Sequence, residues 1–300
     1  MLANGLRISL VFHLALAAAL FLALQANGAA HPLALALSAA ALLEIAPIGL
    51  AALLSRLYAS PAPAGLKLGL WGGLAAFGAE AAAFFLLARI FQPFADFWLG
   101  KDQPAAGGGR PPVLLVHGYV CNRGFWVWLR RRLARAGVNA ATITLDPPFA
   151  DIERLAEQLH VRIETLAAET GQTRIILVGH SMGGLVSRAY LRRFGAARVA
   201  RLITLGTPHC GTRLASFGLG RNARQMEVGN AWLAELNAAP LPVPVTAVWS
   251  AHDTIVAPQD AARLPGAREI EIGGLGHLAM AFSPRILAIL LAELARDDAA

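Results

Sequence analysis

Apolar and polar positions are distributed very unevenly along the chain. Residues 1–100 contain only seven charged side chains, and the other 38 lie in residues 101–300. Because a helix rises about 1.5 Å per residue, about twenty apolar residues suffice to cross the hydrocarbon core of a bilayer. We therefore predict membrane-anchoring helices within residues 1–99, with candidate spans at 6–24, 33–57 and 66–91. The third segment is also compatible with a helix that lies in the membrane interface.

A cleaved signal peptide is the alternative for the first apolar run, since Arg7 precedes it and small residues follow it. A secreted enzyme would not be expected to keep two further apolar runs, so we favour membrane helices. Glu44 and Glu80 lie within those later runs and would be costly if they faced lipid. We expect both to face the interior of the bundle or a polar surface; a shared proton or hydrogen-bond site between them is the alternative.

A Gly- and Pro-rich linker at 100–112 is followed by short apolar runs that alternate with segments of helical spacing, over residues 113–297. The predicted strands are Val113–Val116, Ala140–Leu145, Arg174–Val178, Arg201–Leu205, Val243–Trp249 and Glu269–Ile272. The predicted helices are Phe125–Ala136, Ile152–Thr170, Met182–Phe194, Ala231–Leu236, Gln259–Leu264 and Pro284–Ala295. This alternation predicts an α/β domain with a mostly parallel sheet and helices on both faces. Ligands of such sheets bind beyond the carboxyl ends of the strands.

The composition agrees with a membrane segment followed by a soluble domain, since 56% of the residues are hydrophobic and only 15% are charged. The net charge of +7 does not indicate a nucleic-acid partner, because the basic residues fall in helical patterns such as LRRRLAR without interleaved aromatic residues. Solvated helix faces, which anionic lipid can attract, explain the charge better. The two cysteines, Cys121 and Cys210, make neither a disulfide framework nor a zinc set, and we favour two free thiols over a disulfide.

A serine stands between glycines where an apolar strand passes into a helix, in the pattern Gly179-x-Ser181-x-Gly183. We expect a tight turn, in which a side chain at 179 or 183 would collide with the neighbouring backbone. The helix that begins at Met182 offers unpaired N–H groups and the positive end of its dipole. By itself, the pentapeptide is a modest signal of a nucleophile, and a strand–helix turn with a capping serine is the alternative that other residues must exclude.

Two later strand ends carry residues that can activate this serine. Asp253 follows the run VTAVWS, and His277 follows REIEIGGLG. The order serine, aspartate, histidine is expected when a carboxylate orients an imidazole that deprotonates the serine. Asp146 rivals Asp253, although it precedes the serine in the chain. His252 rivals His277, although it is adjacent to Asp253, and neighbours on an extended segment point apart.

Several other histidines lie near the same strand ends, namely His117, His180 and His209. No pair of them has ligand spacing on a common element, and no carboxylate cluster accompanies them. We therefore expect structural hydrogen bonds from these rings, with no metal and no cofactor.

Five segments together resemble the α/β-hydrolase superfamily and, within it, bacterial triacylglycerol lipases and esterases. They are VLLVHGY, GHSMGG, TLGTPHCGT, SAHDTIVAP and GLGHLAM, within about residues 113–280. The resemblance implies Ser181 as the nucleophile, His277 as the base and Asp253 as the residue that orients His277. It also implies an oxyanion hole made by the backbone amides of Tyr119 and Met182.

Residues 213–230 resemble a lipase lid in position, and their apolar side chains Phe217, Leu219 and Met226 either contact an acyl chain or pack in the ordinary way. Lipases with a calcium site carry acidic residues shortly after the catalytic histidine. The segment HLAMAFSPR has none, so we expect no calcium.

These observations predict a multi-pass, membrane-anchored serine hydrolase of carboxylic esters, with a lipid-like ester as substrate and membrane lipids as partners. An acyltransferase with the same triad, or a non-enzymatic membrane module that keeps the fold, are the alternatives. Lys and Arg in the short loops predict a cytoplasmic N-terminus in the cell (inner) membrane. Three spans would then place the hydrolase on the periplasmic side, and two would leave it in the cytoplasm; we favour three. The sequence does not indicate an oligomeric state.

Overall fold

The computed structural model describes residues 1–102 and 110–296. Residues 103–109, in the predicted linker, and residues 297–300, which include the predicted end of the domain at 297, lie outside it. The N-terminal elements are α1 (Leu2–Ala26), α2 (Pro32–Leu57), the 3₁₀ turn η1 (Ala64–Leu66), α3 (Leu70–Phe85), the π-helical turn η2 (Leu86–Phe91) and α4 (Ala95–Leu99). Helices α1, α2 and the continuous α3–η2 helix are long and apolar enough to cross a membrane.

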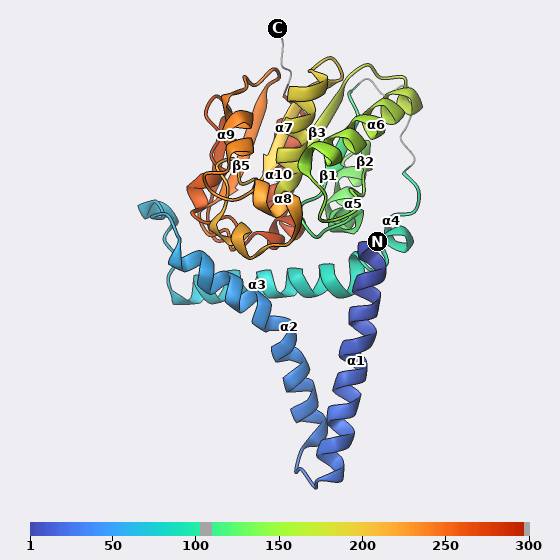
Figure 1. Cartoon of the computed structure of the whole chain (residues 1–300), viewed down its shortest axis with the longest axis vertical. Helices are drawn as coiled ribbons and strands as arrows, with labels where there is room; N and C mark the ends of the chain where they lie inside the picture. Colours follow the sequence, from blue (N-terminus) through green and yellow to red (C-terminus); the bar gives the residue numbers. More distant parts are fainter. Residues whose placement is uncertain (103–109, 297–300) are drawn as a thin grey trace.

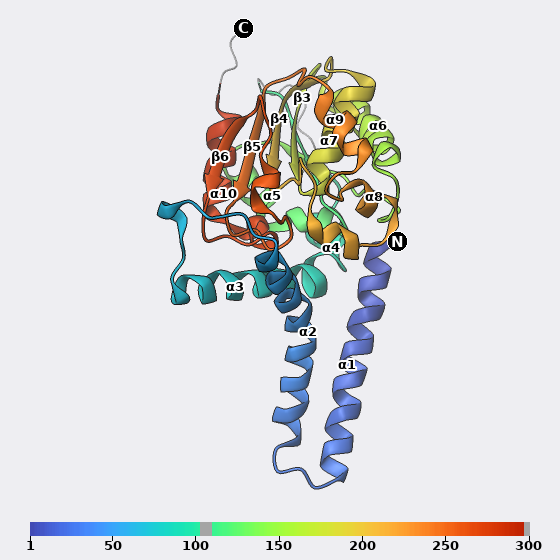
Figure 2. The same ribbon diagram turned by 60° about the vertical axis from the view of Figure 1, so that its left-hand side comes forward.

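The third of these helices is arranged differently from the first two. Helices α1 and α2 form an antiparallel hairpin that projects away from the α/β domain, whereas α3 lies crosswise beneath that domain (Figures 1 and 2). None of the apolar window of α1 and 11% of that of α2 is buried, against 28% of that of α3–η2. The hairpin therefore has the exposure expected of lipid-facing helices, while α3 has the packing of a helix attached to a soluble domain.

Six strands form one fully parallel sheet in the order β2-β1-β3-β4-β5-β6, which confirms the predicted architecture. The strands are β1 (Val113–Val116), β2 (Ala140–Thr142), β3 (Ile175–His180), β4 (Val199–Leu205), β5 (Val245–Ser250) and β6 (Arg268–Ile272). β2 ends three residues before the predicted Leu145, whose N–H donates to Nε2 of His117 rather than to the sheet.

Helices cover both faces of this sheet (Figure 1). They are α5 (Val127–Arg135), α6 (Ile152–Thr170), α7 (Met182–Phe194), α8 (Gly220–Gln225), α9 (Ala231–Ala238) and α10 (Pro284–Leu294). One buried cluster joins α6, α7 and α9 to the sheet, and a second joins α5 and α10 to it. The bounds of α6 are as predicted because both ends carry local signals: Asp151 caps its first turn by accepting from Glu153 N–H at 2.9 Å, and Gly171 ends it with a φ of 69°.

The N-terminal helices meet the end of the domain at which the parallel strands finish. Helix α3 contacts η6 (Leu278–Phe282), η2 contacts η3 (Arg123–Trp126), and α2 contacts η4 (Arg213–Phe217). These three turns follow β6, β1 and β4, so the carboxyl end of the sheet faces the N-terminal apolar helices.

The two acidic residues of the apolar helices are not neighbours with a common site, so the alternative of a shared proton site is wrong. Glu44 accepts from Arg89 at 2.8 Å, near Ser9 and His13 of α1, in the interior of the helix bundle as expected. Glu80 instead faces the α/β domain and is completely buried there.

Candidate active site

Ser181 lies at a sharp turn between β3 and α7. Its φ of 54° and ψ of −126° are unusual for any residue other than glycine. A Cβ atom added at Gly183 would lie 2.3 Å from the carbonyl oxygen of Val116, and one added at Gly179 would lie 2.6 Å from the nitrogen of Gly184. These distances confirm the predicted collision with neighbouring backbone, and they explain why glycine flanks the serine on both sides.

Asp253 and His277 meet beyond the carboxyl ends of β5 and β6. Nδ1 of His277 lies 2.8 Å from Oδ2 of Asp253, and both residues are buried. The other carboxylate oxygen, Oδ1, accepts from the N–H groups of Ile255 and Val256, each at 2.8 Å. Both oxygens of Asp253 are therefore held in place. Because Asp253 holds His277 through Nδ1, Nε2 of His277 is available to take a proton.

The two rival residues have other partners. Oδ2 of Asp146 lies 3.6 Å from the N-terminal nitrogen, and its side chain is partly exposed. Nδ1 of His252 accepts from Gly274 N–H at 3.0 Å. Neither residue joins the Asp253–His277 pair.

His277 lies close to the turn that carries Ser181, because the ring of His180, the residue before Ser181, lies 4.5 Å from the His277 ring, centroid to centroid. Nε2 of His180 also bonds to the His277 carbonyl oxygen at 3.1 Å. Burial alone would lower the pKa of His277, but the charge and hydrogen bond of Asp253, with the charge of Glu80, raise it above its ordinary value of 6.5. The imidazolium form that proton transfer would create is thus stabilised.

The remaining histidines make structural contacts, as expected. Nδ1 of His117 donates to the carbonyl of Gly118 at 2.9 Å, and burial lowers its pKa to about 4. His209 bonds to Thr204 and Arg188. Within residues 1–102 and 110–296 there is no cluster of His, Cys, Asp and Glu able to hold a metal ion, and Cys121 and Cys210 are both free thiols.

The loop after β1 lies against Ser181 at the place expected for an oxyanion hole. A Cβ added at Gly118 would lie 2.8 Å from Cβ of Ser181, so only glycine permits this approach. In the described part of the chain, the N–H groups of Tyr119 and Met182 have no hydrogen-bond acceptor. Val120, the next residue of this loop, has a φ of 48°, so the loop is strained as well as tight.

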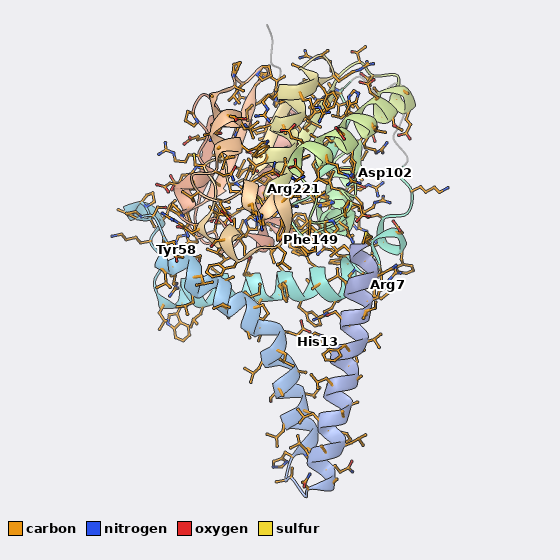
Figure 3. The ribbon with its side chains drawn as sticks, in the orientation of Figure 1. Arg7, His13, Tyr58, Asp102, Phe149 and Arg221 are labelled. Atoms are coloured by element: carbon orange, nitrogen blue, oxygen red, sulfur yellow. The ribbon has the colours of Figure 1, made fainter. Side chains whose placement is uncertain are left out.

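The side chain of Tyr119 attaches the lid-like segment to this loop. Its hydroxyl donates to the carbonyl of Leu219 at 2.8 Å and accepts from Leu219 N–H at 2.7 Å. Phe217 and Leu219 are exposed, as is Phe149, whose ring meets that of Tyr119 at 5.9 Å, whereas Met226 is buried in the core. Figure 3 shows Phe149 at the edge of the α/β domain nearest the N-terminal helices.

Two side chains that the sequence did not reveal as site residues come from the N-terminal segment. Glu80 of α3 accepts hydrogen bonds from the loop that carries His277. Gln92, just after η2, accepts from Asn122 N–H at 2.8 Å, in the loop that carries Tyr119. The only sequence signal for either is a polar residue in or beside an apolar run, and it does not identify the partner.

Comparison with known proteins supports this assignment of the fold. Residues 111–239 match the family model of the alpha/beta hydrolase fold. Curated triacylglycerol lipases from Pseudarthrobacter phenanthrenivorans and Burkholderia plantarii are each 34% identical to the chain over 116 residues, or 36% of this chain. These matches cover 36% and 32% of the two lipases, so the chain spans about a third of their length.

Solved structures agree. The mature Bacillus licheniformis lipase BlEst2 superposes with a TM-score of 0.59 and 20% identity, covering 64% of this chain and 96% of that one. Aspergillus fumigatus lipase B superposes with a TM-score of 0.58, also at 20% identity, over 64% of this chain and 54% of that one. The chain therefore carries an α/β-hydrolase domain. In sequence it resembles triacylglycerol lipases, such as the two named above.

Proposed function

We propose that the protein is a membrane-anchored serine hydrolase that cleaves carboxylic esters of lipids. Oγ of Ser181 attacks the ester carbonyl carbon while Nε2 of His277 takes the hydroxyl proton, and Asp253 holds the imidazolium that forms. The N–H groups of Tyr119 and Met182 stabilise the oxyanion. The carbon–oxygen bond to the alcohol then breaks, and the alcohol takes the proton from His277. Water attacks the acyl-enzyme in the same way and releases the acid.

The observation that carries this proposal is the geometry around Ser181. A non-glycine residue with positive φ at a strand–helix turn, two unpaired amides beside it and a buried histidine–carboxylate pair at 2.8 Å are the parts that acyl transfer needs. The similarity to triacylglycerol lipases supports the ester as the substrate class.

The position of the site relative to the membrane helices supports a lipid as the source of that ester. The carboxyl end of the sheet faces those helices, and Phe149, Phe217 and Leu219 expose apolar surface there. Ser181 and His277 are largely buried, with 6% and 3% exposure, so we expect a bulky lipid ester to need movement of neighbouring groups. The segment 213–230, which Tyr119 attaches to the oxyanion loop, is the element that we expect to move.

We also propose that the chain crosses the membrane twice. The sequence alone favoured three spans and a periplasmic hydrolase, but α3 packs beneath the α/β domain, and α1 begins beside that domain (Figure 1). Arg7, Arg56 and Lys67 lie toward that end of the hairpin, whereas the far turn at 27–31 has no Lys or Arg. Because positive loops stay in the cytoplasm, this arrangement favours a cytoplasmic hydrolase.

Covalent labelling tests the activity. The full chain in detergent should react with a fluorophosphonate at Ser181, and Ser181→Ala should abolish both the labelling and the hydrolysis of esters. A panel of esters should show a preference for longer acyl chains, and product analysis with added alcohols would detect acyl transfer. Absence of labelling in the wild-type protein would exclude the proposed mechanism.

A reporter fused after Ala300 tests the topology. A cytoplasm-only reporter should be active there, and a reporter that works only outside the cytoplasm should be silent. The opposite pattern would restore the three-span arrangement.

A further inference from the structure

We propose that Glu80, on the third apolar helix, is a positioning residue for His277, so that the N-terminal helical segment completes the active site as well as anchoring the α/β domain. This inference rests on the proposed hydrolase function. It concerns a carboxylate that lies far from the triad in the sequence and belongs to a part of the chain that composition marks as membrane anchor.

The three hydrogen bonds that Glu80 accepts in the described part of the chain come from the loops that carry Asp253 and His277. Oε1 accepts from Leu278 N–H at 2.9 Å and Oε2 accepts from Ala279 N–H at 2.8 Å. These amides follow His277 directly and begin the turn η6, where N–H groups have no partner within the turn itself. Glu80 therefore fixes the backbone on the carboxyl side of the catalytic base.

The same carboxylate also reaches the loop of Asp253. The hydroxyl of Thr254, the next residue, donates to Oε1 of Glu80 at 2.7 Å. Oγ1 of Thr254 in turn lies 3.5 Å from the nitrogen of His277. One side chain thus connects the loops of the base and of the residue that orients the base, and it fixes their separation.

The fit around Glu80 is too close for an incidental contact. Glu80 has 0% exposure. A Cβ added at Gly276, the residue before His277, would lie 2.4 Å from Oε2 of Glu80, so a side chain at 276 would force the Glu80 carboxylate to move. A buried carboxylate without hydrogen-bond donors would be costly, and here three donors satisfy it.

Burial raises the pKa of Glu80 itself, and the hydrogen bonds from Leu278, Thr254 and Ala279 oppose that shift by stabilising its charged form. In that charged form, Glu80 acts on His277 in the same direction as its geometry. The titratable groups that face His277 are Asp253, Glu80 and His180. Burial lowers the pKa of His277, Asp253 raises it most, and Glu80 adds to that increase. Removing the Glu80 charge should therefore lower the pKa of the base, an effect that loss of packing alone would not produce.

The far end of the same helix holds the oxyanion loop. The carbonyl of Gln92 accepts from Nδ2 of Asn122 at 2.8 Å, and its side chain accepts from Asn122 N–H. A Cβ added at Gly124 would lie 2.7 Å from Cα of Gln92. The α3–η2 helix and Gln92 thus support the oxyanion loop as well as both triad loops.

The test compares Glu80→Gln with the wild-type full chain in detergent, using a short-chain p-nitrophenyl ester. Glutamine has the same size, but its NH₂ group would face N–H donors. We expect kcat to fall on the order of 10²-fold with KM little changed, as for a small misplacement of a catalytic group. The acid limb of the pH profile of kcat/KM should move to lower pH. Glu44→Gln is the matched control. Glu44 is the other acid of the N-terminal apolar helices, but it contacts Arg89 and not the loops of Asp253 and His277, so this variant should keep wild-type kinetics.

A wild-type kcat in Glu80→Gln, with the acid limb of the kcat/KM profile unchanged, would overturn the proposal. A lower Tm with an unshifted acid limb would also overturn it, because that result indicates a purely structural role. If Glu80→Gln does not fold, Thr254→Val removes the link to the Asp253 loop, and full activity in that variant would refute the proposal. Fluorophosphonate labelling distinguishes failure of the proposed hydrolase function from failure of the proposed role of Glu80. Failure of the wild type to label rejects the hydrolase function, whereas equal labelling rates of wild type and Glu80→Gln reject only the role of Glu80.

Discussion

The backbone of Ser181 provides a direct test of the strained turn. With φ 54° and ψ −126°, this residue occupies a region that suits glycine and costs other residues about 1–3 kcal/mol. Ser181→Gly removes that cost, while Ser181→Ala keeps it. Both variants lose the hydroxyl, so their difference in unfolding free energy isolates the backbone.

The magnitude follows from two opposing terms. Relief of strain favours the glycine variant by about 1–3 kcal/mol, and the greater freedom of glycine in the unfolded chain disfavours it by about 0.5–1 kcal/mol. Ser181→Gly should therefore be more stable than Ser181→Ala by about 0–2.5 kcal/mol, centred at ~1 kcal/mol. For a domain of this size, each kcal/mol corresponds to about 2–4 °C in Tm.

Thermal unfolding of both variants in the same detergent measures this difference. Ser187, in the middle of α7, provides the control, because its hydroxyl donates to the carbonyl of Gly183 and its backbone is helical. There the order should reverse, since glycine is less favourable than alanine within a helix by about 1 kcal/mol. If Ser187 shows that reversal and Ser181→Ala is also more stable than Ser181→Gly, the strained turn is not the conformation in solution.

Three further predictions concern the triad, the oxyanion hole and pH. Asp253→Ala should lose most ester hydrolysis while Asp146→Ala keeps it, because only Asp253 contacts His277; the reverse result would move the orienting role to Asp146. Tyr119→Phe should remain within a few-fold of wild type on short esters, whereas Tyr119→Pro, which removes the N–H, should lose roughly 10²–10³ in kcat; equal losses would implicate the phenol. Although burial lowers the pKa of His277, Asp253 and Glu80 raise it above 6.5. The kcat/KM of the wild type should therefore fall as the pH drops through a value above 6.5. An acid limb below 6.5 would contradict this.

Much of the α/β domain could be predicted because its signals are local. The bounds of β1, α6 and α7 match the predicted segments, since continuous apolar runs and caps define them within a few residues. The requirement for glycine at 179 and 183 was predicted for the same reason, because in a tight turn a side chain at either position would collide with neighbouring backbone. The order of Ser181, Asp253 and His277 along the chain then indicated which strand ends carry residues that act together. The structure places Asp253 and His277 in contact.

The placement of α3 could not be predicted, because hydropathy measures the cost of transferring a segment from water and not what the segment packs against. Leu70–Phe91 meets the length and composition of a span, and nothing in its residues distinguishes lipid from a protein face. Glu80 is the clearest case: an acid in an apolar helix predicts some polar partner, but its partners are the amides of Leu278 and Ala279, and any residue except proline supplies an amide. The one sequence trace of this contact is Gly276, whose missing side chain makes room for the carboxylate, and that glycine acquires its meaning only when α3 lies beside it.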